Sequence, residues 1–171
     1  MKYAVIDVGS NTVRLCVYDV LCPEKRKFKT IMNRKIMAGL AAYIVDGAFF
    51  DEGIAEAILA VKKCIKRASY LSPDRIDVFA TAVLRNISNS AQAIAAIEQG
   101  AGCTISLLSN ADEAHLGFVG ASSRGTLDDG ALIDIGGGST EITVIENGID
   151  VARTSLPQGS LSSYKRFVGD I

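Results

Sequence analysis

The feature that most constrains this chain is a short string that occurs twice. Residues 5–12 read VIDVGSNT, and residues 132–140 read LIDIGGGST. In each copy an apolar run ends in aspartate, and glycine and small hydroxyl residues follow at once. Because glycine permits a tight bend, each copy predicts two strands joined by a small turn. The fold must therefore hold two such turns, each at the end of an apolar strand.

Along the chain, the spacing of hydrophobic residues alternates between two residues, which is typical of a strand, and 3.6 residues, which is typical of a helix. Strands are expected over 3–7, 12–20, 28–36, 75–82 and 104–108, with a hairpin over 131–156 that turns at ENG. Helices are expected over 51–70, 89–99 and 111–122. Asp51 is available to cap the first helix, and the second can be capped by Asn89 or Ser90 and end at Gly100. The first helix is expected to bury one face, made of Ile54, Ile58, Val61, Ile65 and Ala68. The alternation of strand and helix predicts an α/β protein.

Each turn is suited to bind phosphate. Successive backbone N–H groups and hydroxyl side chains form a concave set of donors, and the aspartate at the strand end is placed to hold a cation or its water. A single copy is equally consistent with an ordinary glycine hairpin. The pair in matching contexts favours a clamp around a phosphoanhydride.

Composition excludes several classes of protein. The chain is 49% hydrophobic with a formal net charge of −1, which gives no reason to expect binding to nucleic acid or to an anionic membrane surface. The apolar run at the N-terminus is interrupted by Asp7 too early for a secretory signal or a membrane span, so a cytoplasmic protein is expected. The four cysteines lack metal-binding spacing and are expected to be free thiols.

The repeat is unequal in length. The first copy starts at residue 5 and the second at residue 132, whereas the sequence ends at residue 171. A duplicated architecture would be incomplete after the second copy, so a fragment of a longer two-lobed protein is expected. An unfinished lobe would expose apolar surface, and we expect self-association as a result.

Four segments together resemble one family. AVIDVGSNTVRLCVYD, ATAVLRN, LLSNADEAHLGFVGA and LIDIGGGSTEITV are similar, in this order, to the N-terminal motifs of the exopolyphosphatase/guanosine pentaphosphate phosphohydrolase family. That family belongs to the superfamily of actin, sugar kinases and heat-shock chaperones. The resemblance implies an α/β actin-like (ribonuclease H-like) fold with a mixed five-stranded sheet and flanking helices. It also implies a first lobe over 1–125 and an incomplete second lobe over 126–171, opened by the GGGST hairpin.

The resemblance assigns roles to individual residues. Glu113 matches the family's general base, and Arg85 matches an arginine that faces the phosphates. Asp134 and Glu141 match residues associated with magnesium. The phosphate-binding positions implied are Asp7, Gly9, Ser10, Asn11, Thr12, Gly136, Gly137, Gly138, Ser139 and Thr140. Taken without the resemblance, Arg85 reads as a surface arginine and Glu113 as a solvated carboxylate in the first turn of a helix.

The implied activity is magnesium-dependent release of terminal phosphate from inorganic polyphosphate, from guanosine pentaphosphate, or from both. Water attack on a phosphoryl group needs positioning and charge neutralisation, which donor loops, a metal ion and an arginine supply. Two alternatives stay open. One is an ATP-binding, kinase-like protein of the same superfamily, and the other is a non-catalytic module that senses phosphate or nucleotides.

Two stretches leave further choices open. The family commonly has Ser-Gly-x-Glu-Glu-Ala-Arg at 109–115, where this chain has SNADEAH. Asn110 suits a left-handed position, and His115 either weakens a contact to a distal phosphate or lies on the helix surface, which we favour. The basic run KRKFK at 25–29, with Arg34 and Lys35 nearby, is either a track for polyphosphate or, as we favour, a guard on a sheet edge.

Overall fold

The computed structural model describes residues 1–24, 27–123 and 125–169. The chain divides into two compact units, Met1–Leu107 and Leu108–Ile171. The helix expected over 111–122 thus belongs to the second unit. The sequence assigned this helix to the first lobe, which was expected to span residues 1–125. That lobe boundary stays a prediction.

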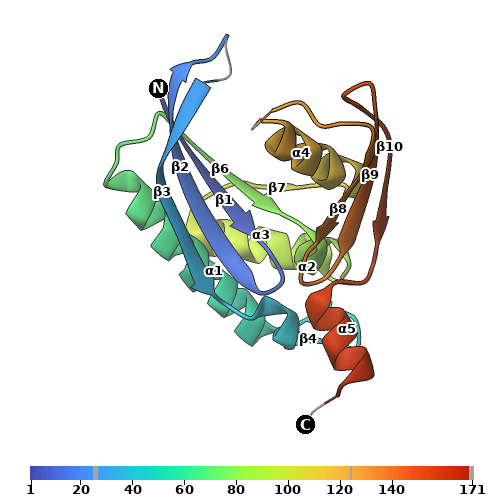
Figure 1. Ribbon diagram of the computed structural model, residues 1–171. Coiled ribbons are helices and arrows are strands. Elements are labelled where there is room, and N and C mark those ends of the chain that lie inside the picture. Colours follow the sequence, from blue (N-terminus) through green and yellow to red (C-terminus); the bar gives the residue numbers. More distant parts are fainter. Residues whose placement is uncertain (25–26, 124, 170–171) are drawn as a thin grey trace. The chain divides into compact units, whose positions relative to one another are not determined.

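The first unit is built on a mixed five-stranded sheet (Figure 1). Its strands are β1 (Lys2–Val8), β2 (Thr12–Cys22), β3 (Lys27–Met37), β6 (Arg75–Ala80) and β7 (Ile105–Leu107), in the order β3-β2-β1-β6-β7. The first three form an antiparallel meander, and β6 and β7 continue the sheet parallel to β1. This arrangement confirms the mixed sheet that the sequence predicted.

Helices α1 (Asp51–Ser69) and α3 (Ser90–Ala101) pack against this sheet, and α2 (Ala82–Arg85) is a single turn after β6. A small element before α1 was not anticipated. It consists of the 3-10 helix η1 (Leu40–Tyr43) and the hairpin of β4 (Ile44–Val45) and β5 (Ala48–Phe49). Asp46 and Gly47 form its turn with φ of 49° and 76°, the backbone that an Asp-Gly pair favours in a two-residue hairpin.

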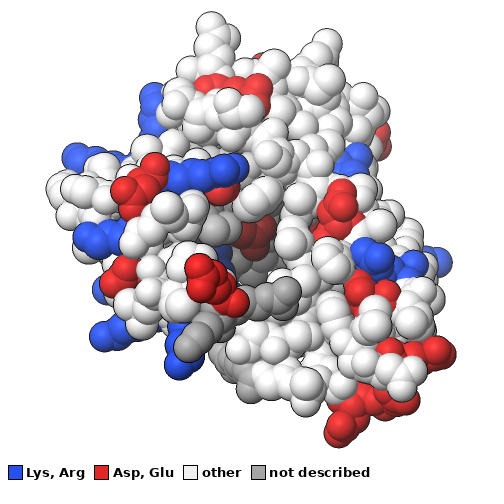
Figure 2. Space-filling model, turned by 90° about the horizontal axis from the view of Figure 1, so that it is seen from above, with Lys and Arg blue, Asp and Glu red and all other residues white. Residues whose placement is uncertain are grey.

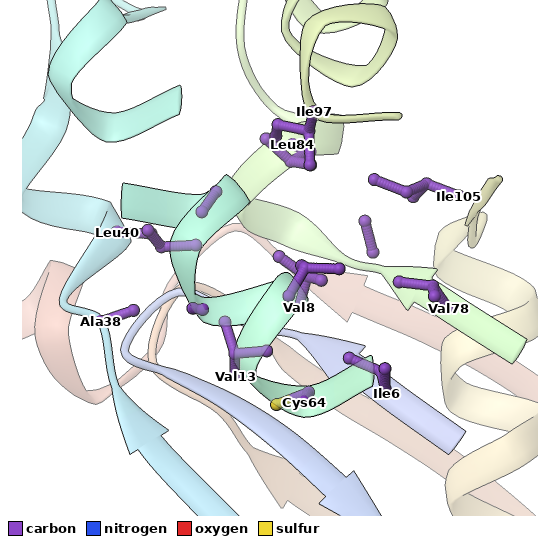
Figure 3. Packing of buried hydrophobic residues seen from close by; sticks show 14 of the residues in the cluster. Ile6, Val8, Val13, Ala38, Leu40, Cys64, Val78, Leu84, Ile97 and Ile105 are labelled. Carbon is purple, nitrogen blue, oxygen red and sulfur yellow. The ribbon is translucent and has the colours of Figure 1, made fainter. Parts of the chain in front are cut away.

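The core of the first unit lies between the sheet and the helices (Figure 3). Ile6, Val8 and Val13 of the meander are fully buried there. The face of α1 matches the expected one only at Val61 and Ala68, since its fully buried residues are mostly small: Ala57, Ala60, Val61, Cys64 and Ala68. Ile54, Ile58 and Ile65 are only partly buried at the margin of this core. Small side chains along the centre allow the helix to approach the sheet closely.

The ends of the two long helices correct three sequence predictions. Phe50, not Asp51, is the N-cap residue of α1. Asn89 occupies the N-cap position of α3 but makes no capping bond; its side chain accepts from Phe49 N and donates to Phe49 O, both at 2.9 Å. Helix α3 continues through Ala101 and ends at Gly102, which takes the left-handed conformation at φ 68°.

The second unit is a three-stranded antiparallel sheet with two helices. Strands β8 (Gly130–Ile135), β9 (Thr140–Glu146) and β10 (Ile149–Leu156) lie in the order β10-β9-β8. Asn147 and Gly148 turn the β9–β10 hairpin with φ of 53° and 73°, as ENG predicted. Helix α4 (Asn110–Ser122) packs on one face of this sheet, and α5 (Ser160–Phe167) follows β10 and was not predicted.

The surface charge is mixed. Lys and Arg occur among Asp, Glu and uncharged residues on the face shown in Figure 2. Of the basic run, Lys25 and Arg26 lie outside the described residues, while Lys27 and Lys29 are exposed on the edge strand β3. The four cysteines are free thiols, as predicted. Among the described helices, none combines the length and apolarity that crossing a bilayer demands.

Candidate functional site

The two repeated strings form the same turn. Gly9 N donates to Thr12 O at 3.1 Å, and Gly136 N donates to Ser139 O at 2.9 Å. In both turns the Cα of the glycine lies close to the carbonyl oxygen that its own N–H binds. A Cβ added to Gly9 would lie 3.2 Å from Thr12 O, and one added to Gly136 would lie 3.3 Å from Ser139 O. Contacts this short are tighter than most side chains tolerate, so each turn favours glycine at its first position.

Strand register relates the two turns residue by residue. In the first unit Asp7 lies opposite Arg14 and Val8 opposite Val13. In the second unit Asp134 lies opposite Glu141 and Ile135 opposite Thr140. Thr12 therefore corresponds to Ser139, not to Thr140. The correspondence also shows a difference in charge, because a carboxylate faces an arginine in one copy and a second carboxylate in the other.

Arg85 and the first turn lie at the same edge of the five-stranded sheet. Val8 and Ala80 are partners in the parallel pair β1–β6, so the turn after β1 and helix α2 after β6 both follow the carboxyl ends of their strands. The Nε and Nη2 atoms of Arg85 are buried. This placement suits an arginine directed at a ligand near the turn, in the way that α/β sheets bind ligands at the carboxyl ends of their strands.

Helix α4 places Glu113 on the side of Asp134. The Thr143 hydroxyl lies 3.4 Å from Ala114 O, so α4 covers the face of the sheet that also carries Asp134 and Glu141. A Cβ on Gly117 would be 3.9 Å from Asp134 Oδ2. Glu113 is one helical turn before Gly117 and shares its face of the helix. The second unit thus holds Glu113, two further carboxylates and the glycine turn in one region.

The two opposed carboxylates differ in exposure. Glu141 is 5% exposed and accepts a hydrogen bond from Ser155 Oγ at 2.8 Å, whereas Asp134 is exposed. Carboxylate oxygens suit magnesium, which binds proteins through one or two carboxylates and keeps water and phosphate oxygens as its other ligands. Among the described residues no three His, Cys, Asp or Glu side chains gather as a metal centre. The donor set therefore fits a cation shared with a phosphate ligand and not a closed protein cage.

Of the predicted phosphate-binding side chains, one is hydrogen-bonded to the backbone and two are buried. The Thr140 hydroxyl donates to Gln158 O at 2.6 Å, so its proton is not available to a phosphate. Ser10 and Ser139 are 8% and 3% exposed, which leaves the backbone as the principal donor of each turn. The N–H groups of Gly137 and Gly138 donate to no backbone carbonyl of the described chain.

Asp112, one of the residues that depart from the family's pattern, helps to cap helix α4. The Ser109 hydroxyl accepts from Asp112 N at 3.1 Å and donates to the Asp112 carboxylate at 2.6 Å, which caps the helix. Asn110 is the first helical residue and does not adopt positive φ, contrary to expectation.

His115 is not a bare surface residue. Its Nδ1 lies 2.7 Å from Asp150 Oδ2, which joins α4 to β10. This hydrogen bond is the main cause that lowers the pKa of the Asp150 carboxyl, and the Arg153 guanidinium at 3.3 Å adds to it.

Sequence reasoning missed the segments that support the turns. Residues 38–41 bind the carbonyls of the first turn, and residues 160–162 bind those of the second. The glycines at 39 and 159 are the one local signal that was available, since glycine often marks a close approach of two backbones.

Solved structures share this fold over nearly the whole chain. An exopolyphosphatase from Cytophaga hutchinsonii is 25% identical, with a TM-score of 0.88 over 98% of this chain and 54% of its own. The Ppx/GppA family member of Aquifex aeolicus is 22% identical, with a TM-score of 0.80 over 98% of this chain and 54% of its own. The ethanolamine utilization protein EutJ of Carboxydothermus hydrogenoformans is 22% identical, with a TM-score of 0.56 over 99% of this chain and 58% of its own.

These likenesses confirm an α/β fold of the actin-like ATPase kind, and the chain spans about half the length of each structure. A family profile matches residues 22–170, which include the alanine-rich ATAVLR segment, the α4 helix and the second glycine turn. The chain belongs to the Ppx/GppA phosphatase family.

Proposed function

We propose that this chain carries the catalytic groups of a phosphoanhydride hydrolase that releases terminal phosphate from inorganic polyphosphate or guanosine pentaphosphate. The observation that carries the proposal is the convergence, within the second unit, of the Glu113 face of α4, Asp134 and the glycine turn. Family membership and the likeness to an exopolyphosphatase support it. A cytoplasmic location is part of the same proposal.

In this mechanism the chain positions a phosphate and a water. The N–H groups of Gly137 and Gly138 bind phosphate oxygens, and Glu113 orients the attacking water and accepts its proton. Arg85 of the first unit offers a planar fork of donors, a geometry that suits phosphate oxygens. Asp134 and Glu141 would hold magnesium, which neutralises phosphate charge when bound. The reaction cleaves the terminal P–O bond, and the proton taken by Glu113 is later returned to solvent.

The test is release of orthophosphate from long-chain polyphosphate in the presence of magnesium. Glu113→Gln keeps the shape of the side chain and removes the base, so turnover should fall by about 10²- to 10⁴-fold, the usual contribution of a general base. Glu146→Gln is the matched control, because Glu146 is an exposed carboxylate at the opposite end of β9 from the glycine turn. Equal activity in the two variants would refute the role of Glu113.

One competing function is a non-catalytic module that binds phosphate or nucleotides without turning them over. The chain spans 54% of the Cytophaga exopolyphosphatase. If the chain releases no phosphate, the same assay on a chain extended past Ile171 separates the two cases. Activity in the longer chain supports the hydrolase, and inactivity with retained phosphate binding supports a sensor. Thermal protection by ATP and magnesium, but not by polyphosphate, would favour a kinase-like protein.

A further inference from the structure

The glycine turn of the second unit rests on the start of helix α5. Ser160 N donates to Gly136 O at 2.9 Å, and Leu161 N and Ser162 N donate to Gly137 O at 3.0 and 3.2 Å. Helix N-terminal N–H groups have no partner within their own helix. Here these groups are satisfied by the carbonyl oxygens of the turn, so the turn and the helix start form one hydrogen-bonded unit.

This pairing sets the direction of the opposite groups of the turn. In a trans peptide the C=O of one residue and the N–H of the next point in opposite directions. Because the carbonyls of Gly136 and Gly137 are directed at α5, the N–H groups of Gly137 and Gly138 are directed away from it. These are the N–H groups that donate to no backbone carbonyl of the described chain.

Gly159 allows the close contact. A Cβ at this position would lie 2.5 Å from Gly136 O and 2.7 Å from Gly137 O, distances that no side chain tolerates without moving the backbone. Hydrogen bonds also fix the backbone on both sides of Gly159. Gly159 N donates to Ser162 Oγ at 2.7 Å, and the carbonyl of the preceding residue accepts from Thr140 at 2.6 Å.

The first unit contains a related support. Ala41 N, at the start of η1, donates to Ser10 O at 2.8 Å, while Ala38 N and Gly39 N donate to Asn11 O at 3.1 and 2.9 Å. The repeat therefore extends beyond the two turns to the helix that follows the third strand of each meander. The accepting carbonyls are offset by one residue between the units, because Ser10 corresponds to Gly137 and not to Gly136. In both units, however, carbonyls of the turn accept from N–H groups at or just before the start of the following helix, which indicates that this support serves the turn.

We propose that Gly159 and Ser162 are positioning residues, which act through the backbone of Gly136–Gly138 to direct its N–H groups at a phosphate ligand. The inference rests on the proposed function for the identity of the ligand. It assigns no contact between phosphate and Gly159 or Ser162 themselves. They determine how well the N–H groups of the turn are oriented for binding.

The test measures binding of magnesium tripolyphosphate by calorimetry to the parent chain and its variants. Gly159→Ala should weaken binding by about tenfold or more, since displacing a binding group by a fraction of an ångström is costly. Ser162→Ala should weaken it by a smaller factor, about threefold, and Ser162→Thr should restore it, because the hydroxyl returns. Ser163→Ala is the control, because it makes the same chemical change one residue further along the helix. Among the described residues, the Ser163 side chain makes no hydrogen bond to the turn, so the affinity of this variant should stay within about twofold of the parent's.

A spectroscopic readout separates this inference from the proposed function. In the unliganded protein, the amide NMR resonances of Gly137 and Gly138 should shift in Gly159→Ala, whereas those of the Asn147–Gly148 turn should not. If the parent chain fails to bind tripolyphosphate, the proposed ligand is wrong, and the amide shifts alone decide the positioning role. Unshifted turn amides, or equal losses of affinity in the Ser162 and Ser163 alanine variants, would overturn it. Should Gly159→Ala not fold, the serine variants decide between the two outcomes.

Discussion

Gly53 in helix α1 provides a test of how the first turn is supported. A Cβ at this position would lie 2.5 Å from Tyr43 Cβ and 2.6 Å from Phe49 Cε2. Tyr43 belongs to η1, and Ala41 in the same helix donates to Ser10 O of the turn. A side chain at residue 53 therefore pushes on the element that holds the turn.

The two contributions to the stability of Gly53→Ala have opposite signs. Alanine in a helix interior is favoured over glycine by about 1 kcal/mol. Overpacking a tight core costs about 1–3 kcal/mol, and this contact belongs near the upper end, because Tyr43 Cβ is fixed by the backbone and Phe49 is 2% exposed. The net expectation is a loss of about 2 kcal/mol in the free energy of unfolding of the first unit.

Two other helical glycines are controls. A Cβ on Gly100 of α3 would meet only the side chain of Ile58, with Cδ1 at 2.5 Å and Cγ1 at 2.9 Å, and this partly buried side chain can move, so Gly100→Ala should cost less than Gly53→Ala. A Cβ on Gly120 of α4 would meet nothing within 4 Å, and Gly120→Ala should stabilise its unit by about 0.5–1 kcal/mol. Urea unfolding followed by circular dichroism gives all three values, since the chain has no tryptophan. A stability of Gly53→Ala at or above the parent's would refute the packing argument.

Two further predictions concern charged side chains. His115 lowers the pKa of the Asp150 carboxyl, so the pair contributes stability that is present above the ordinary carboxyl pKa of 3.8 and is lost as the pH falls through the lower pKa of the folded protein. The difference in urea stability between the parent and Asp150→Asn should therefore shrink below about pH 4. A difference that stays constant with pH would contradict this prediction. Lys27→Gln with Lys29→Gln should leave the salt dependence of polyphosphate binding unchanged, because both residues lie on an edge strand; a smaller slope in a salt titration would place them on the substrate path.

Local patterns were sufficient to predict most elements of the fold. The strands around both glycine turns, helix α1 and the Asn147–Gly148 hairpin follow from hydrophobic period and turn chemistry, which act over a few residues. The face of α1 was less predictable. Ile54 and Ile58 have the stronger hydrophobic signal, but close packing on the sheet selects the small Ala57 and Ala60. Such a choice depends on the distance between elements, which no local pattern contains.

Contacts between residues distant in sequence also limited the prediction of the candidate site. Resemblance singled out Glu113 and Asp134, and the structure brings α4 and β8 together at Gly117 and Asp134, with Glu113 one helical turn before Gly117. Thr140 was assigned to phosphate because it belongs to the string GGGST, yet its hydroxyl binds Gln158 O, 18 residues further along the chain. Gly159 was overlooked for the same reason: its importance arises from contact with Gly136 and Gly137, which are distant in sequence.

The charge difference between the two turns argues for a division of roles within the repeat. Asp7 lies opposite Arg14, and opposite charges at facing positions of a strand pair are favourable. Asp134 lies opposite Glu141, and two like charges at facing positions of a strand pair are unfavourable, which a bound cation would offset. The proposed magnesium ion therefore belongs with the second turn, while the first turn offers backbone donors without a comparable demand for a metal.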